Sequence, residues 1–157
     1  MEKIDFTYFL EQFDFIELPI TIREETFEEF SEGVAPLPSA LIDQYLAIDE
    51  EDDGMTEFVA CFQIPNLKDF KAIVFWKAGL LSYEYILATY RNDGQPIAAK
   101  VIAGTAVKDE QLIQSIATID SDLIIHIATG IGSTDGVFDA TQSAMRQLEI
   151  TIEGEIE

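Results

Sequence analysis

The acidic run from Asp49 to Asp53, followed by Gly54, is the stretch whose residue types and spacing come nearest to a metal site. Asp49, Glu51 and Asp53 match the first, third and fifth positions of a calcium-binding EF-hand loop, where carboxylate oxygens bind the ion. The last position of that loop must supply a bidentate carboxylate, and Ala60 stands there. We therefore expect a solvated acidic loop and no bound metal.

His126 and Cys61 are the only histidine and the only cysteine of the chain. His126 stands between two isoleucines, and catalysis would require a serine, a cysteine or a carboxylate beside it, which the sequence does not identify. Cys61 lies within the strand-like run 58–64, where a buried and inert thiol is expected. These residues form no catalytic constellation, so we do not expect an enzyme.

The glycines of the run 130–136 resemble a dinucleotide-binding fingerprint, because Gly130, Gly132 and Gly136 follow a strand-like run. The third glycine is one place late, and only Val137 to Glu157 remain after it. That remainder is too short for a βαβ unit, so no nucleotide cofactor is expected. A flexible connection at the rim of a sheet is the prediction here.

The run 70–129 organises the chain, and it predicts five successive strands. Three short polar turns separate most of them, at Asn92-Asp93-Gly94, Lys108-Asp109-Glu110 and Asp120-Ser121-Asp122. Connections this short pair strands antiparallel, because a parallel pair needs a crossover of a dozen or more residues. Apolar residues occupy both faces of the run 81–88, so this sheet needs cover on both faces.

Short helices are predicted before the strands. Apolar residues at helical spacing place a helix at 5–13, with Phe6, Phe9 and Phe13 directed at the core. A short strand at 18–22 precedes an acidic helix at 24–31, and Ser39 is expected to cap a helix that runs to about residue 46.

The segment 24–54 resembles the opening of the SMI1/KNR4 superfamily. A Phe-x-x-Phe helix is followed by Leu-Pro, a helix with a Tyr-Leu pair and a Gly-containing acidic loop. The matching positions are Phe27, Phe30, Leu37, Pro38, Tyr45, Leu46 and Gly54. Many bacterial members of that superfamily are immunity proteins that neutralise co-produced toxins, so the resemblance implies an immunity-like role.

Together these elements predict an α+β fold in a single domain, residues 1–157. We expect an acidic helical part, 1–54, packed on an antiparallel sheet formed by 57–152. The sheet is expected to be a meander of about six to eight strands that is curled or barrel-like. A propeller-like blade array is the alternative. Asp139 could cap a last helix, but Leu148, Ile150 and Ile152 alternate, which favours a closing strand.

Charge is the most unusual property of the chain, with a formal net charge of −21. Residues 1–57 carry seventeen acidic side chains against Lys3 and Arg23, a balance of −15. Such a field repels nucleic acid and anionic lipid and attracts basic proteins, although acidity alone also confers solubility. The predicted partner-binding residues are Glu24, Glu25, Glu28, Glu29, Asp49, Glu50, Glu51, Asp52 and Asp53.

The sequence therefore predicts a non-enzymatic interaction module that binds a basic partner protein, without metal or cofactor. The alternative is a β-barrel that binds a small ligand, motivated by the aromatic residues of the strands, although core packing also explains those rings. The N-terminus Met-Glu-Lys-Ile-Asp has neither the basic nor the apolar region of a signal peptide, so a cytoplasmic protein is expected. The oligomeric state is left open.

Overall fold

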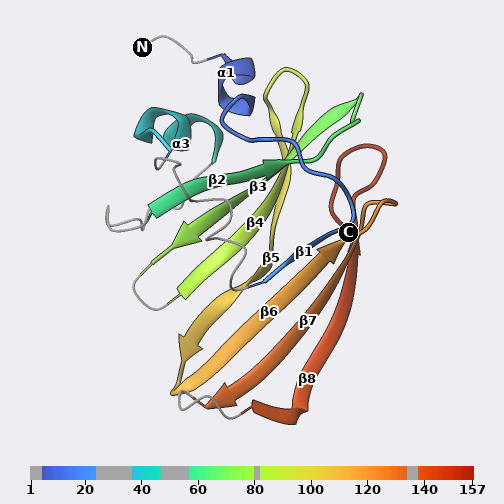
Figure 1. Cartoon of the computed structure of the whole chain (residues 1–157). Coiled ribbons are helices and arrows are strands. Elements are labelled where there is room, and N and C mark those ends of the chain that lie inside the picture. Colours follow the sequence, from blue (N-terminus) through green and yellow to red (C-terminus); the bar gives the residue numbers. More distant parts are fainter. Residues whose placement is uncertain (1–4, 24–36, 47–56, 80–81, 134–137) are drawn as a thin grey trace.

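The structure is a computed structural model, and it describes residues 5–23, 37–46, 57–79, 82–133 and 138–157. Its main feature is one antiparallel sheet of eight strands. The strands are β1 (Ile20–Ile22), β2 (Glu57–Gln63), β3 (Phe70–Ala78), β4 (Ser82–Arg91), β5 (Pro96–Lys108), β6 (Gln111–Ile119), β7 (Ile124–Ser133) and β8 (Phe138–Glu149). Two short helices, α1 (Phe6–Leu10) and α3 (Ser39–Tyr45), precede the long strands (Figure 1). The predicted α+β meander is confirmed.

The sheet is open, so the expected barrel-like closure and the propeller alternative are both wrong. Strands β2 to β8 follow one another in chain order, and β2 and β8 lie at opposite ends of that order. Within the described residues no ladder joins β8 to β2. A single continuous sheet also differs from the separate small sheets that the blades of a propeller require.

A bend in β5 divides the sheet into two half-sheets. This strand of 13 residues pairs with β4 from Pro96 to Ala106 but with β6 only from Gly104 to Lys108. Gly104 has φ +144°, and a Cβ atom there would collide with the carbonyl oxygen of Tyr83, so only glycine fits. Figure 1 shows the consequence: β2 to β4 form an upper half-sheet and β6 to β8 a lower one, with β5 passing between them.

The N-terminal segment ties the two half-sheets together. Phe15 forms a parallel bridge with Gln63 of β2, and β1 then pairs with β6 from Ile20 opposite Ile119 to Ile22 opposite Ala117. The ladder between β5 and β6 does not include the end of β6 from Ala117 to Ile119, and β1 pairs with the strand edge that is left free there. A strand edge that would otherwise be exposed is therefore paired.

The first hydrophobic core fills the space between the half-sheets. It contains fully buried residues of the upper half-sheet, such as Val74 and Leu87, together with Ile119 and Ile125 of the lower one. Ile22 of β1 belongs to the same cluster. Burial of this face explains the alternation of apolar residues along β3 and β4.

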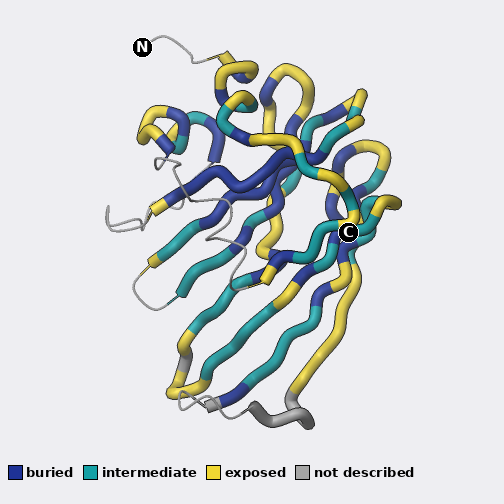
Figure 2. Tube along the Cα trace, viewed as in Figure 1, coloured by how far each residue is buried: buried dark blue, intermediate teal, exposed yellow. Residues whose placement is uncertain are grey.

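The second core lies on the opposite face of β2 to β4, beneath α1 and α3. Phe9 of α1 stacks on Tyr45 of α3 with ring centroids 4.6 Å apart, and contacts Tyr90 of β4 edge-on at 5.7 Å. Phe75 and Ala88 of the sheet belong to this cluster too. The prediction that the sheet needs cover on both faces is confirmed, and Figure 2 shows β2 buried along nearly its whole length and β3 buried along its middle.

Most local predictions agree with the structure. Asp5 caps α1 by accepting a hydrogen bond from the Thr7 amide at 2.9 Å, and Phe6, Phe9 and Phe13 are buried as expected. The three turns are found between the predicted strands, with φ +96° at Gly94 in the first of them. The C-terminal stretch is strand β8, as favoured over a helix.

Two local predictions are wrong, and one cannot be compared. Ser39 is the first residue of α3, and the capping position before it is Pro38, whose side chain has no oxygen that could accept a capping hydrogen bond. Gly130 and Gly132 lie within strand β7, whereas a flexible connection was expected. The helix predicted at 24–31 lies outside the described residues.

Replacing Phe9 by alanine tests the packing of the helices on the sheet. Phe9 has no exposed surface, so Phe9→Ala should lower the free energy of unfolding by about 3–5 kcal/mol in urea titrations. The neighbouring Tyr8 is 49% exposed, and Tyr8→Ala should change stability by no more than about 0.5 kcal/mol. Equal losses in the two variants would contradict the packing described here.

Candidate functional site

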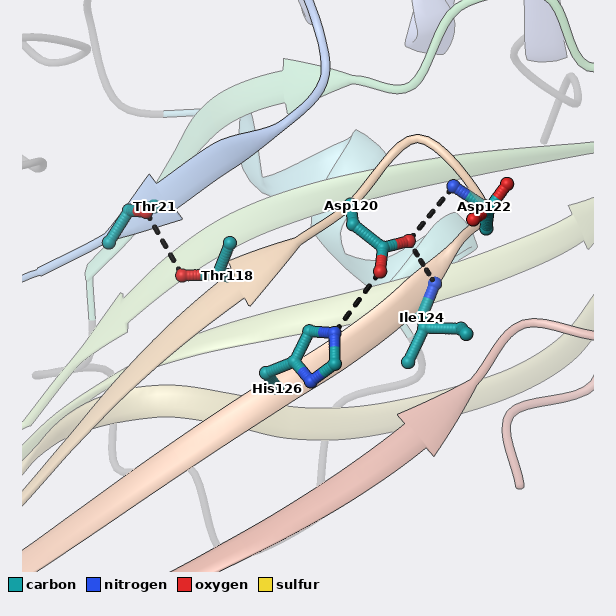
Figure 3. A network of polar contacts seen from close by, with 6 residues as sticks. All are labelled: Thr21, Thr118, Asp120, Asp122, Ile124 and His126. Atoms are coloured by element: carbon teal, nitrogen blue, oxygen red, sulfur yellow. Dashed lines mark hydrogen bonds and ion pairs between the residues drawn. The ribbon is translucent and has the colours of Figure 1, made fainter.

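The turn between β6 and β7 carries a network of polar contacts (Figure 3). One carboxylate oxygen of Asp120 accepts hydrogen bonds from the amides of Asp122 at 2.9 Å and Ile124 at 3.1 Å. Its other oxygen lies 3.1 Å from Nε2 of His126. His126 of β7 lies opposite Thr118 of β6 in the ladder. The Thr118 hydroxyl lies 3.0 Å from the hydroxyl of Thr21 in β1.

These contacts keep Asp120 ionised. The backbone amide of Ile124 is the largest cause that lowers the pKa of this carboxyl, followed by the hydrogen bond with His126. Because the pKa is lower in the folded protein, the contribution of Asp120 to stability is present above the ordinary aspartate pKa, near 3.9. This stabilising contribution is lost as the pH falls through the pKa of Asp120 in the folded protein.

The sequence identified no partner for His126, and the structure places the carboxylate of Asp120 beside it. A tight turn brings the two together across five intervening residues, and the sequence signal was the aspartate at the start of that turn. The pair is open to solvent, with 45% of the His126 side chain exposed. Thr118, the nearest hydroxyl across the ladder, is engaged with Thr21. We read the network as a turn that holds β6 and β7 in register.

Cys61 is buried in β2, as predicted. Burial raises the pKa of its thiol to about 12, so the reactive thiolate is almost absent at neutral pH. The described residues also contain no group of three or more His, Cys, Asp or Glu side chains that could hold a metal ion.

A groove of about 400 Å³ lies on the helix-covered face of the upper half-sheet, beside the end of α3, and is called the β5 groove below. Its floor is apolar, and the buried Tyr90 hydroxyl at its inner end donates to the carbonyl of Tyr45 at 2.7 Å. Its lining residues are Tyr45, Leu46, Phe58, Phe75, Lys77, Ile86, Ala88, Thr89, Tyr90 and the run 96–101.

A second groove, of about 690 Å³, lies where the N-terminal segment passes the β6–β7 turn, and is called the turn groove. Phe15 stands at its rim with 65% of its surface exposed. Glu17 also lines it, as does Ser121 between Asp120 and Asp122. The cation nearest in sequence to its lining is Lys68, while Lys71 donates to the carbonyl of Leu67 at 2.8 Å. The remaining lining residues are Ile16, Leu18, Pro65, Asn66, Leu67 and Leu123.

The predicted partner-binding residues lie outside the part of the chain that the structure describes. This applies to Glu24, Glu25, Glu28, Glu29, Asp49, Glu50, Glu51, Asp52 and Asp53, and to most of the calcium-like loop. Four positions of the superfamily resemblance are described. Leu37, Tyr45 and Leu46 are buried in the second core, and Pro38 precedes α3.

Comparisons with known proteins give no relative: no family model, no curated protein and no solved structure matches this chain. The resemblance to the SMI1/KNR4 superfamily therefore stays a prediction. Among the described residues no helix is long and apolar enough to cross a membrane.

The pKa of Asp120 separates a structural turn from a coupled acid–base pair. Because the Ile124 amide is the largest cause, Asp120 in a His126→Ala variant should still titrate below the ordinary aspartate value in carboxyl NMR spectra. Wild-type stability should fall with acidification through the same pH range. A return of Asp120 to an ordinary pKa in the variant would show that His126 controls it.

Thiol labelling tests the burial of Cys61. With a pKa near 12, the thiolate fraction at pH 8 is about a thousandfold lower than for an unperturbed cysteine. Native protein should therefore react with a thiol reagent at least about a thousandfold more slowly than protein unfolded in urea. Rates within tenfold of each other would contradict the buried placement.

Proposed function

We propose that the protein is a non-enzymatic interaction module that binds a basic partner protein. The observation that carries this proposal is the concentration of charge: the balance of −15 in residues 1–57 accounts for most of the net −21. An asymmetric field of this kind accelerates the encounter with a protein of opposite charge, and it disfavours nucleic acid and anionic lipid.

The turn groove offers an apolar anchor for such a partner. Complementary charge speeds association and orients the partner, whereas slow dissociation needs desolvated apolar contacts. Phe15 is a large exposed aromatic side chain next to a groove that also contains Leu18 and Leu67. With Glu17 in the lining and Asp122 at the turn, this surface fits a basic segment that carries an apolar side chain.

The kind of partner follows from the superfamily resemblance of residues 24–54. Immunity proteins of the SMI1/KNR4 type neutralise toxins, so we propose that the basic partner is a protein toxin produced alongside this chain. The resemblance and the acidic balance point to the same third of the sequence, which is why they support each other.

A ligand-binding barrel is less well supported. The inner face of the sheet is packed with fully buried residues from both half-sheets, including Val74 and Ile125, and the sheet does not close around a lumen in the described residues. The grooves lie outside this core.

Salt-dependent capture with charge-swapped variants tests the proposal. A variant with Glu24, Glu25, Glu28 and Glu29 changed to Lys should lose a basic partner that wild-type protein captures stoichiometrically from its host at low salt. With the purified partner, its association rate should fall about tenfold or more and its dissociation rate should change little.

The matched control changes four exposed acidic residues elsewhere to Lys, namely Asp69, Glu110, Glu149 and Glu153. It makes the same change in net charge and should keep most of the association rate. If the association rate falls equally in both variants, or if no basic partner is retained at low salt, the N-terminal third is not the docking surface.

A further inference from the structure

The β5 groove combines an apolar floor with cations, although the chain has only nine lysines and arginines against thirty acidic residues. Lys77 and Lys100 both line it. Arg146 of β8 reaches its border, where Nη2 lies 3.4 Å from the carbonyl oxygen of Val101, another lining residue. Two of the nine cations therefore line this groove, and Arg146, which lines the neighbouring pocket, stands at its border.

Lys100 has an apolar residue, Leu87, opposite it in the ladder, whereas Lys77 has Glu84 opposite it. No ion pair within 4.0 Å joins Lys77 or Lys100 to any acidic residue that the structure describes. Glu84 does not line the groove. An anion bound beside Lys100 would supply the opposite charge that this ammonium group lacks.

The groove also reaches an unpaired strand edge. All residues from Pro96 to Val101 line it, so the groove follows the edge of β5. Along this part β5 pairs with β4 only, because its ladder with β6 starts at Gly104. Backbone amides on the free edge can donate hydrogen bonds to an acidic group, as amides do at other anion sites.

We infer that the β5 groove binds a small anionic amphiphile, an apolar molecule with a carboxylate or similar acidic head. The apolar body would lie against Phe58, Phe75 and Ile86, on the face that also carries Lys77, and the head would lie at the free edge of β5 beside Lys100. A volume of about 400 Å³ lies within the range of small-molecule sites, roughly 300–1,000 Å³.

The strong negative charge of the chain does not prevent this binding. At physiological ionic strength the Debye length is about 8 Å, so distant carboxylates are screened while an ammonium group in contact with the ligand acts almost in full. The inference is independent of the partner-binding proposal, because the turn groove and residues 24–29 take no part in it.

The test uses three ten-carbon probes that differ only in the head group: decanoate, 1-decanol and decylammonium. Amide NMR titrations of the wild-type protein should show saturable shifts at Phe75, Ile86 and Ala98, with decanoate bound about tenfold more tightly than decanol and decylammonium weakest. Equal affinity for the three probes, shifts confined to the turn groove, or no saturable shift with decanoate would each overturn the inference.

Variants then separate the head from the body of the ligand. Lys77→Gln with Lys100→Gln should weaken decanoate about tenfold and leave decanol unchanged, since each exposed charge contributes a few-fold. The control, Lys68→Gln with Arg91→Gln, removes two cations that do not line the groove and should leave the affinity for both probes unchanged. Ala99→Trp, which fills the groove from an exposed lining position, should weaken both. If the two double variants weaken decanoate binding equally, the affinity depends on the net charge of the protein and not on a site that contains Lys77 and Lys100.

Discussion

Burial of both faces of β3 and β4 is the constraint on which the rest of this structure depends. One face carries Val74 and Leu87 and the other carries Ile73 and Ala88, and all four are buried. A two-faced apolar sheet cannot remain exposed to water, because each buried aliphatic side chain is worth about 1.5–3 kcal/mol. The helices cover one face, and the bend in β5 brings the lower half-sheet over the other.

This arrangement also explains where the free surfaces are. The bend lets β6 separate from β5, so β1 pairs with one strand edge while the edge of Pro96–Ala103 remains available. The segment that carries β1 crosses from β2 to β6 and forms the turn groove with the β6–β7 turn. Both grooves are therefore consequences of the same covering of the sheet, and they differ in charge: carboxylates lie at the turn groove and lysines at the β5 groove.

The antiparallel meander was predictable because its signals are local. Turn residues such as Gly94 and the alternation of apolar residues depend only on neighbours in sequence. The bend at Gly104 was not predictable, because its need for glycine arises from the carbonyl of Tyr83 on the adjacent strand. Apolar and polar residues alternate along each strand both in an open sheet and in a closed barrel. This pattern therefore could not show that the sheet stays open.

The candidate sites were harder to predict than the fold. The contact between Asp120 and His126 needs only a turn of known type, but the two residues are six positions apart, so adjacency in the sequence does not reveal it. The grooves combine residues from strands far apart in the chain, such as Lys77 and Lys100, so no sequence motif marks them. Conversely, the acidic N-terminal third was visible from composition alone, because charge balance does not depend on the fold.

Native-state hydrogen exchange tests most directly whether burial on both faces holds this fold together. Amides that open only on global unfolding exchange most slowly. The account predicts that the slowest amides lie in β3 and β4, at positions such as Ile73, Val74 and Leu87, and that those of the exposed edge strand β8 exchange much faster. Slowest exchange in β6 to β8, with β3 and β4 opening in advance of them, would contradict it.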